Sequence, residues 1–86
     1  MNLQQRGRLR DLTRAFSAGR DQSKAVAGEI EFLLDEEFPD DDEMQDYVSD
    51  LSRFAPGGGE HLHDENQIAK VCRDILRRLE ATEDGE

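Results

Sequence analysis

Residues 64–79 read DENQIAKVCRDILRRL, and this stretch decides the fold class that the sequence predicts. Asp64 is followed three residues later by Gln67, a capping-box pattern in which each side chain bonds the other's backbone N–H at a helix start. The apolar residues then recur at the three- and four-residue spacing of a helix that buries one face. That face comprises Ile68, Val71, Cys72, Ile75 and Leu79, with Leu76 at its margin.

Three earlier segments repeat this helical spacing. The first spans about 3–18 and stops before Gly19, a residue type that often ends helices. The second spans about 22–37, and the third follows Pro39 and spans about 40–54. The predicted buried positions on these segments are Leu9, Leu12, Phe16, Val26, Ile30, Leu33, Leu34, Met44, Tyr47, Val48, Leu51 and either Phe54 or Ala55.

Four amphipathic helices with short links predict an all-α fold, a compact antiparallel four-helix bundle. Each helix is apolar on one face only and can bury that face only against the others. A chain of 86 residues suffices for one domain, which we expect over residues 1–82, with a frayed acidic tail at 83–86. Either Asp21 or Ser23 is expected to cap the second helix, and residues 56–59 (PGGG) predict a flexible link before the fourth.

The composition excludes several classes of function. No apolar run approaches the roughly 18–20 residues of a membrane span, and the N-terminus lacks the apolar stretch of a secretory signal. Cys72 is the only cysteine, so the chain forms no intrachain disulfide, and we expect a reducing cytoplasm. A formal net charge of −10 argues against direct binding of nucleic acid or membranes. It favours fast, salt-sensitive association with a basic protein.

The negative charge is concentrated in the middle of the chain. Residues 1–24 carry a net charge of +4, residues 25–66 carry −13 and residues 67–86 carry −1. Residues 25–52 contain eleven carboxylates and neither lysine nor arginine. Solvated helices usually mix signs, because like charges four residues apart cost about 0.2–0.5 kcal/mol. We interpret the run as a surface for a basic partner; the alternative is a solvated face in which residues 40–43 only stabilise a helix start.

The predicted partner-binding surface adds one aromatic side chain to these carboxylates. Phe32 lies on the far side of its helix from Ile30 and Leu33, and an exposed aromatic ringed by charge is typical of a binding hot spot. The alternative is that Phe32 packs beneath another helix. The surface comprises Glu29, Phe32, Asp35, Glu36, Asp40, Asp41, Asp42, Glu43, Asp46 and Asp50.

Catalysis and metal binding are weakly supported by the residues. Cys72 lies within an apolar stripe, where a cysteine is most often a small core residue. His61 and His63 are two apart between acidic residues, but they lack helical spacing and a cysteine partner, and a solvated loop explains them equally. The glycines at 57–59 lack the Lys-Ser/Thr of a phosphate-binding loop. We expect no enzymatic activity, no metal and no cofactor.

The second half of the chain resembles a known family. Residues 51–56 (LSRFAP), residues 63–65 (HDE) and residues 73–79 (RDILRRL) resemble the C-terminal half of the colicin D type of immunity proteins, in the bacterial self-protective colicin-like immunity family. The resemblance covers residues 44–80 in sequence and residues 9–38 in layout.

This resemblance implies a function that agrees with the charge pattern. It implies an immunity protein that covers the basic active site of a cognate nuclease toxin, and in the colicin D system that toxin cleaves transfer RNA. The negative surface would then replace the RNA backbone in a cleft lined with cationic side chains. The alternative, from the regulatory class, is an acidic adaptor or anti-activator that masks a basic nucleic-acid-binding protein.

Overall fold

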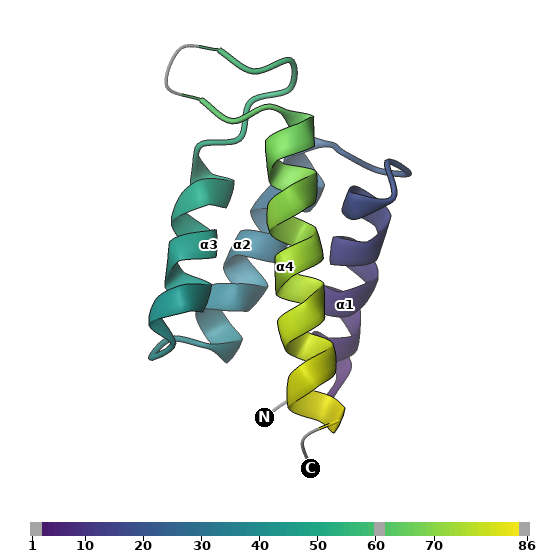
Figure 1. Cartoon of the computed structure of the whole chain (residues 1–86), viewed down its shortest axis with the longest axis vertical. Helices are drawn as coiled ribbons and strands as arrows, with labels where there is room; N and C mark the ends of the chain where they lie inside the picture. The colour runs from purple at the N-terminus through teal and green to yellow at the C-terminus, as the bar shows by residue number, and fades with distance from the viewer. Residues whose placement is uncertain (1–2, 60–61, 85–86) are drawn as a thin grey trace.

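The four predicted helices form, and they alternate in direction along the chain (Figure 1). A computed structural model describes residues 3–59 and 62–84, with side-chain burial from residue 4 to residue 81 within those ranges. The described residues contain no strand, and the fold is a small all-α four-helix bundle, as predicted. The helices are α1 (Leu3–Ser17), α2 (Lys24–Glu37), α3 (Asp42–Ser52) and α4 (Glu65–Asp84).

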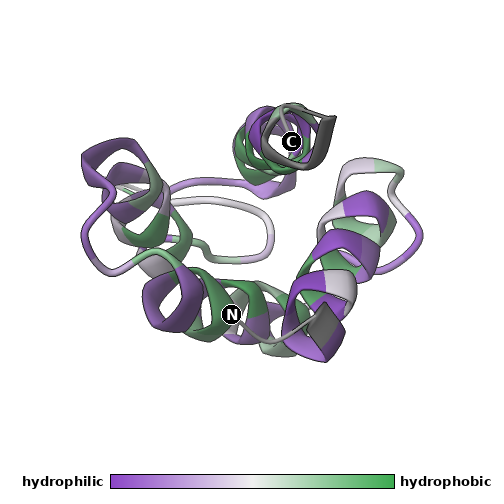
Figure 2. Cartoon of the chain, turned by 90° about the horizontal axis from the view of Figure 1, so that it is seen from below, coloured by the Kyte–Doolittle hydropathy of each residue, from purple (hydrophilic) through white to green (hydrophobic). Residues whose placement is uncertain are grey.

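The helices enclose a common apolar interior. α1 packs against α2 and α4, α2 packs against α3, and α3 approaches α4 least closely of these neighbouring pairs. Figure 2 shows the apolar stretches of the ribbon turned toward one another and the polar stretches turned outward. The Cα radius of gyration is 12.1 Å, which agrees with the roughly 12 Å of a compact domain of this length.

Side-chain caps set where three of the helices begin. The hydroxyl of Ser23 accepts from the backbone N–H of Val26 at 3.2 Å, so Ser23, and not Asp21, is the N-cap of α2. At α4 the backbone N–H of Asp64 donates to Gln67 Oε1 and the N–H of Gln67 donates to Asp64 Oδ1, both at 2.9 Å. The predicted capping box is therefore confirmed. Asp41 caps α3 through a single bond, in which its carboxylate accepts from the backbone N–H of Met44.

The helix ends follow backbone geometry. Gly19 adopts φ 78°, a left-handed conformation, and the backbone N–H of Arg20 returns to the carbonyl of Ala15 at 2.9 Å. This geometry ends α1 as predicted. α4, in contrast, continues to Asp84, two residues into the segment that we expected to be frayed.

The core contains the predicted apolar stripes, and the structure places Phe54, not Ala55, in it. The Phe54 ring meets Phe16 edge-on, with centroids 5.3 Å apart. Ala27 and Ala69 are also buried, and the helical pattern had not singled them out. The fully or largely buried apolar residues are Leu9, Phe16, Ala27, Ile30, Leu33, Leu34, Met44, Leu51, Phe54, Ile68, Ala69, Cys72, Ile75 and Leu79.

The glycine-rich link between α3 and α4 forms a turn held by hydrogen bonds. The backbone N–H of Gly57 donates to Glu65 Oε1 at 2.9 Å, and the N–H of Gly58 donates to the Ala55 carbonyl at 2.8 Å. Gly58 has φ 79°, and a Cβ there would lie 3.2 Å from the Cβ of Asp64. A glycine is thus required at this position by both conformation and space.

The helices of the described residues are too polar to cross a membrane. None of them combines the length and the apolar character that a membrane-spanning helix requires.

Candidate partner-binding surface

Five exposed acidic residues lie where α2 ends and α3 begins, at the lower left of Figure 1. This location follows from local sequence: Phe38 ends α2, Pro39 and Asp40 form the turn, and Asp42 lies in the first turn of α3. None of these exposed carboxylates has a cation within ion-pair distance among the described residues. We call the group the acidic end; its members are Asp35, Glu36, Asp40, Asp42 and Asp46.

The other predicted carboxylates are not free, which corrects the expectation drawn from a stretch without lysine or arginine. Glu29 pairs with Arg8 of α1 at 2.5 Å. Asp50 lies 3.5 Å from Nε2 of His63 in the link before α4. Two more, Asp41 and Glu43, are held by one arginine of α4. The residues that these four carboxylates meet come from other parts of the fold, so the local sequence could not show them.

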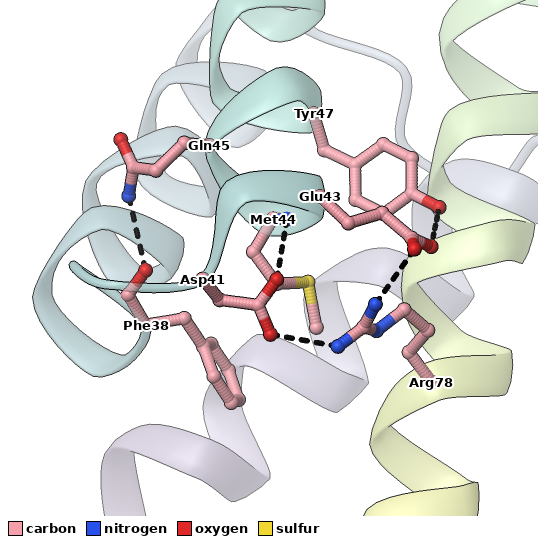
Figure 3. Close-up of polar contacts among 7 residues, drawn as sticks. All are labelled: Phe38, Asp41, Glu43, Met44, Gln45, Tyr47 and Arg78. Carbon is pink, nitrogen blue, oxygen red and sulfur yellow. Dashed lines mark hydrogen bonds and ion pairs between the residues drawn. The ribbon is translucent and has the colours of Figure 1, made fainter.

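Arg78 joins α4 to α3 through two carboxylates (Figure 3). Its Nη2 atom lies 2.7 Å from Asp41 Oδ2, and its Nη1 atom lies 2.8 Å from Glu43 Oε2. Asp41 uses its second oxygen, Oδ1, to accept from the backbone N–H of Met44 at 3.0 Å. One side chain therefore both caps α3 and anchors α4. The contact lies between the two neighbouring helices that approach least closely.

Tyr47 extends this polar cluster. Its hydroxyl donates to Glu43 Oε1 at 2.8 Å. Burial raises the pKa of Tyr47 to about 12, and the hydrogen bond to Glu43 and the negative charges of Glu43 and Asp74 add to the shift, while Arg78 opposes it. The tyrosine therefore acts as a neutral donor across the physiological range. The cluster is a structural connection within the bundle and leaves Asp41 and Glu43 less available to a partner.

Phe32 is exposed, which decides between the two alternatives for this residue. Its relative exposure is 58%, the largest among the big apolar side chains that the structure describes. The exposed positions Ala25, Gly28, Phe32 and Asp35 follow one another at helical spacing on the side of α2 opposite the core. Phe32 therefore lies on the solvent-facing side of α2, and this side continues to Asp35, a member of the acidic end.

One of the basic residues of α1 is buried in the bundle. Arg6 is only 6% exposed, and its guanidinium carbon lies 5.3 Å from the centroid of the Phe38 ring. The sequence reasoning missed this residue, although Arg6 shares the helical spacing of Leu9, Thr13 and Phe16 and is buried with them.

An open cavity of about 350 Å³ lies on the outer side of α1. It is lined by Asp11, Arg14, Ala15 and Arg20, so most of its walls carry charge of both signs. The cavity is separate from the acidic end in sequence, and three of its four lining residues are charged.

The residues that first suggested chemistry occupy structural positions. Cys72 is fully buried, and burial raises the pKa of its thiol to about 12, which leaves no appreciable thiolate at neutral pH. His63 is partly buried beside Asp50, and His61 lies outside the described residues. Across residues 3–59 and 62–84, no three histidine, cysteine, aspartate or glutamate side chains are grouped as a metal site would require.

No protein-family model, curated protein or solved structure matches this chain. The resemblance to colicin-like immunity proteins therefore stays a prediction.

Proposed function

We propose that this protein is an immunity protein that neutralises a cognate nuclease toxin, most specifically one that cleaves transfer RNA, by covering its basic active site. The single observation that carries the proposal is the acidic end. Five exposed carboxylates without cationic neighbours gather at one end of the α2–α3 pair. The like-charge repulsion among them would be relieved by a partner that supplies cations.

The geometry of the acidic end suits the replacement of nucleic acid. Asp35 and Glu36 belong to α2, and Asp46 belongs to α3. Both helices pack into the core, so the backbones of these three residues are ordered before any partner binds. Carboxylates on rigid elements can accept charge-assisted hydrogen bonds from arginine and lysine side chains that otherwise hold phosphates. Preorganised carboxylates lose little conformational entropy on binding.

The net charge of −10 supports the same proposal through kinetics. Opposite charges on two proteins accelerate their encounter, and this acceleration weakens as salt increases. An inhibitor must occupy a toxin before the toxin meets its substrate, so fast capture is the relevant property. The three carboxylates that pair with arginines inside the fold, Glu29, Asp41 and Glu43, contribute to the long-range field but are poorer contact groups.

The test uses the full-length chain and the nuclease domain encoded beside its gene. Binding is measured by calorimetry at low and high salt, and inhibition is measured as protection of transfer RNA from cleavage. The test variant is Asp40→Asn combined with Asp46→Asn. The matched control is Asp11→Asn combined with Asp21→Asn, which changes the net charge equally at exposed positions outside the acidic end, one on α1 and one before α2 begins.

The proposal expects binding and protection by the wild-type chain, with about three- to tenfold weaker binding at low salt for the test variant. The control variant is expected to stay within about twofold of wild type. Equal weakening by both variants would show that only net charge matters and would contradict a specific acidic end. Absence of a complex at low salt, or binding without protection of the RNA, would contradict the immunity function.

A further inference from the structure

Gly28 lies in the interior of α2, where, as at Gly7 in α1, neither backbone conformation nor packing requires a glycine. A glycine inside a helix costs about 0.5–1 kcal/mol relative to alanine, because it has more conformational freedom to lose on folding. Such a residue is normally retained where the backbone needs a left-handed conformation or where another element packs closely. Gly28 has neither requirement: its φ is not positive, and a Cβ built on it would meet nothing within 4 Å.

The open space at Gly28 lies next to the exposed ring of Phe32. In a helix, side chains lean back toward the N-terminus, so a residue covers the turn that precedes it. Phe32 follows Gly28 by one helical turn on the same exposed face, and none of its atoms comes within 4 Å of a Cβ built at position 28, so the space between the two positions is open. Ala25, one turn earlier, is exposed and small as well. The small residues at positions 25 and 28 therefore leave about two turns of helix surface uncovered beside Phe32, and a flat group has access to the ring from that side.

Two carboxylates stand on the other side of the ring. Asp35 and Glu36 follow Phe32 by three and four residues, so both lie one turn away on the same surface. Both are exposed and have no cation within ion-pair distance among the residues that the structure describes. An aromatic face with carboxylates at its edge is complementary to a cation that is both flat and able to donate several hydrogen bonds.

The arginine side chain has these two properties, and the lysine side chain has only the charge. A guanidinium group is planar, stacks on aromatic rings and donates in a fork that matches a carboxylate. The same molecule already contains such a contact, since the guanidinium carbon of Arg6 lies 5.3 Å from the Phe38 ring centroid. That contact lies inside the bundle and involves Phe38, so Phe32 remains open to solvent. It shows that an arginine can stack on a phenylalanine ring in this fold.

We propose that Gly28, Phe32, Asp35 and Glu36 form a seat for an arginine side chain of the basic partner, with the guanidinium stacked on Phe32 and hydrogen-bonded by the two carboxylates. This inference rests on the proposed function and adds the chemistry by which the partner is recognised. It also explains the glycine: a side chain at position 28 would occupy the space that the stacked guanidinium needs.

The experiment titrates the ¹⁵N-labelled full chain with two probes, octa-arginine and octa-lysine, at low salt. The seat predicts that octa-arginine binds about two- to fivefold more tightly than octa-lysine, the range expected for an exposed cation–π contact. The largest amide shifts are expected at Gly28 and Phe32. Phe32→Ala is expected to remove the preference for arginine, and Gly28→Leu is expected to do so while leaving the ring in place.

Two measurements separate the seat from a general effect on folding. Gly28→Ala is expected to raise the Tm, because nothing obstructs the added methyl group, and yet to weaken the octa-arginine preference by about twofold. Leu62→Ala removes the other exposed large apolar side chain, 44% exposed in the link before α4, and is expected to leave the preference unchanged.

The outcomes distinguish this inference from the proposed function. Equal affinity for both peptides, with amide shifts confined to Asp40, Asp42 and Asp46 and lost in the Asp40→Asn, Asp46→Asn variant, would overturn the arginine seat and leave the proposed function standing. Absence of binding by either peptide would contradict both. A preference for arginine that persists in Phe32→Ala and Gly28→Leu would place the recognition elsewhere and overturn the seat.

Discussion

The Nη2 atom of Arg78 lies 2.7 Å from Oδ2 of Asp41, and this ion pair ties α4 to the residue that caps α3. The two residues are 37 positions apart in the chain. Because α3 and α4 approach each other less closely than the other neighbouring helices, a polar connection at this place takes over part of the role of apolar packing. It also withdraws Asp41 from the surface that would meet a partner.

Replacement of Arg78 by methionine is expected to lower the free energy of unfolding by about 1 kcal/mol, because Asp41 and Glu43 lose a shared, partly buried cation. Urea denaturation measures the change. Arg77→Met is the matched control: Arg77 is 80% exposed and lies 3.8 Å from Asp74, so its loss should cost less than about 0.5 kcal/mol. Equal effects of the two substitutions would contradict a structural role for Arg78.

Asp46→Lys is expected to stabilise the fold and weaken binding of the basic partner. Asp42 and Asp50 each lie four residues from position 46, so a lysine replaces two repulsive pairs by attractive ones. The expected gain is about 0.5 kcal/mol in low salt, and it should shrink as salt screens the charges. Thermal unfolding at several salt concentrations measures it. A loss of stability at low salt would show that Asp46 has an attractive contact that the charge pattern does not reveal.

Tyr47 is expected to make the stability of the fold sensitive to alkaline pH. Its pKa is raised from 10.0 to about 12, chiefly by burial, so its contribution is complete below pH 10 and is lost as pH rises to about 12. Tyr47→Phe lacks this group, and the gap in unfolding free energy between wild type and variant should narrow over that interval. Denaturant titrations at pH 8, 10 and 11 would measure this gap, which is expected to be smaller at pH 11 than at pH 8. A constant gap would mean that Tyr47 ionises equally in the folded and unfolded chain.

Cys72 is expected to resist thiol reagents until the bundle opens. The side chain is fully buried, and burial raises its pKa from 9.0 to about 12, so both access and ionisation are suppressed. At pH 8 the native chain should react with a disulfide reagent at least about a hundredfold more slowly than the unfolded chain. Ser49→Cys, which places a second thiol on the exposed side of α3, should give one fast and one slow reaction. A fast reaction of both thiols would show that the core around Cys72 opens readily.

The helices and their buried faces could be predicted because the responsible interactions act over a few residues. The stripe from Ile68 to Leu79 and the reciprocal bonds of Asp64 and Gln67 follow directly from the helical period and from the unpaired N–H groups at a helix start. The same reasoning placed the end of α1 at Gly19. It left open which of Asp21 and Ser23 caps α2, since both residue types accept the same hydrogen bond.

The candidate site could be predicted only in part. The exposed carboxylates of the acidic end follow from a stretch of sequence, but the pairing of Glu29 and Asp50 depends on which cations the neighbouring segments present. The exposure of Phe32 was equally undecided, because helical spacing shows that it points away from Ile30 and cannot show whether another helix lies there.

The sequence by itself determined four amphipathic helices, the capping box of α4 and an excess of negative charge over the middle of the chain. These properties depend on residue type and on spacing within a turn or two of helix. Only the tertiary structure decided which carboxylates remain free, that Arg6 is buried against Phe38 and that Phe32 stands in solvent beside a bare Gly28. The physical reason is that charge pairing and exposure are set by contacts between segments far apart in the chain, as for Arg78 and Asp41, and no local pattern encodes which helices become neighbours.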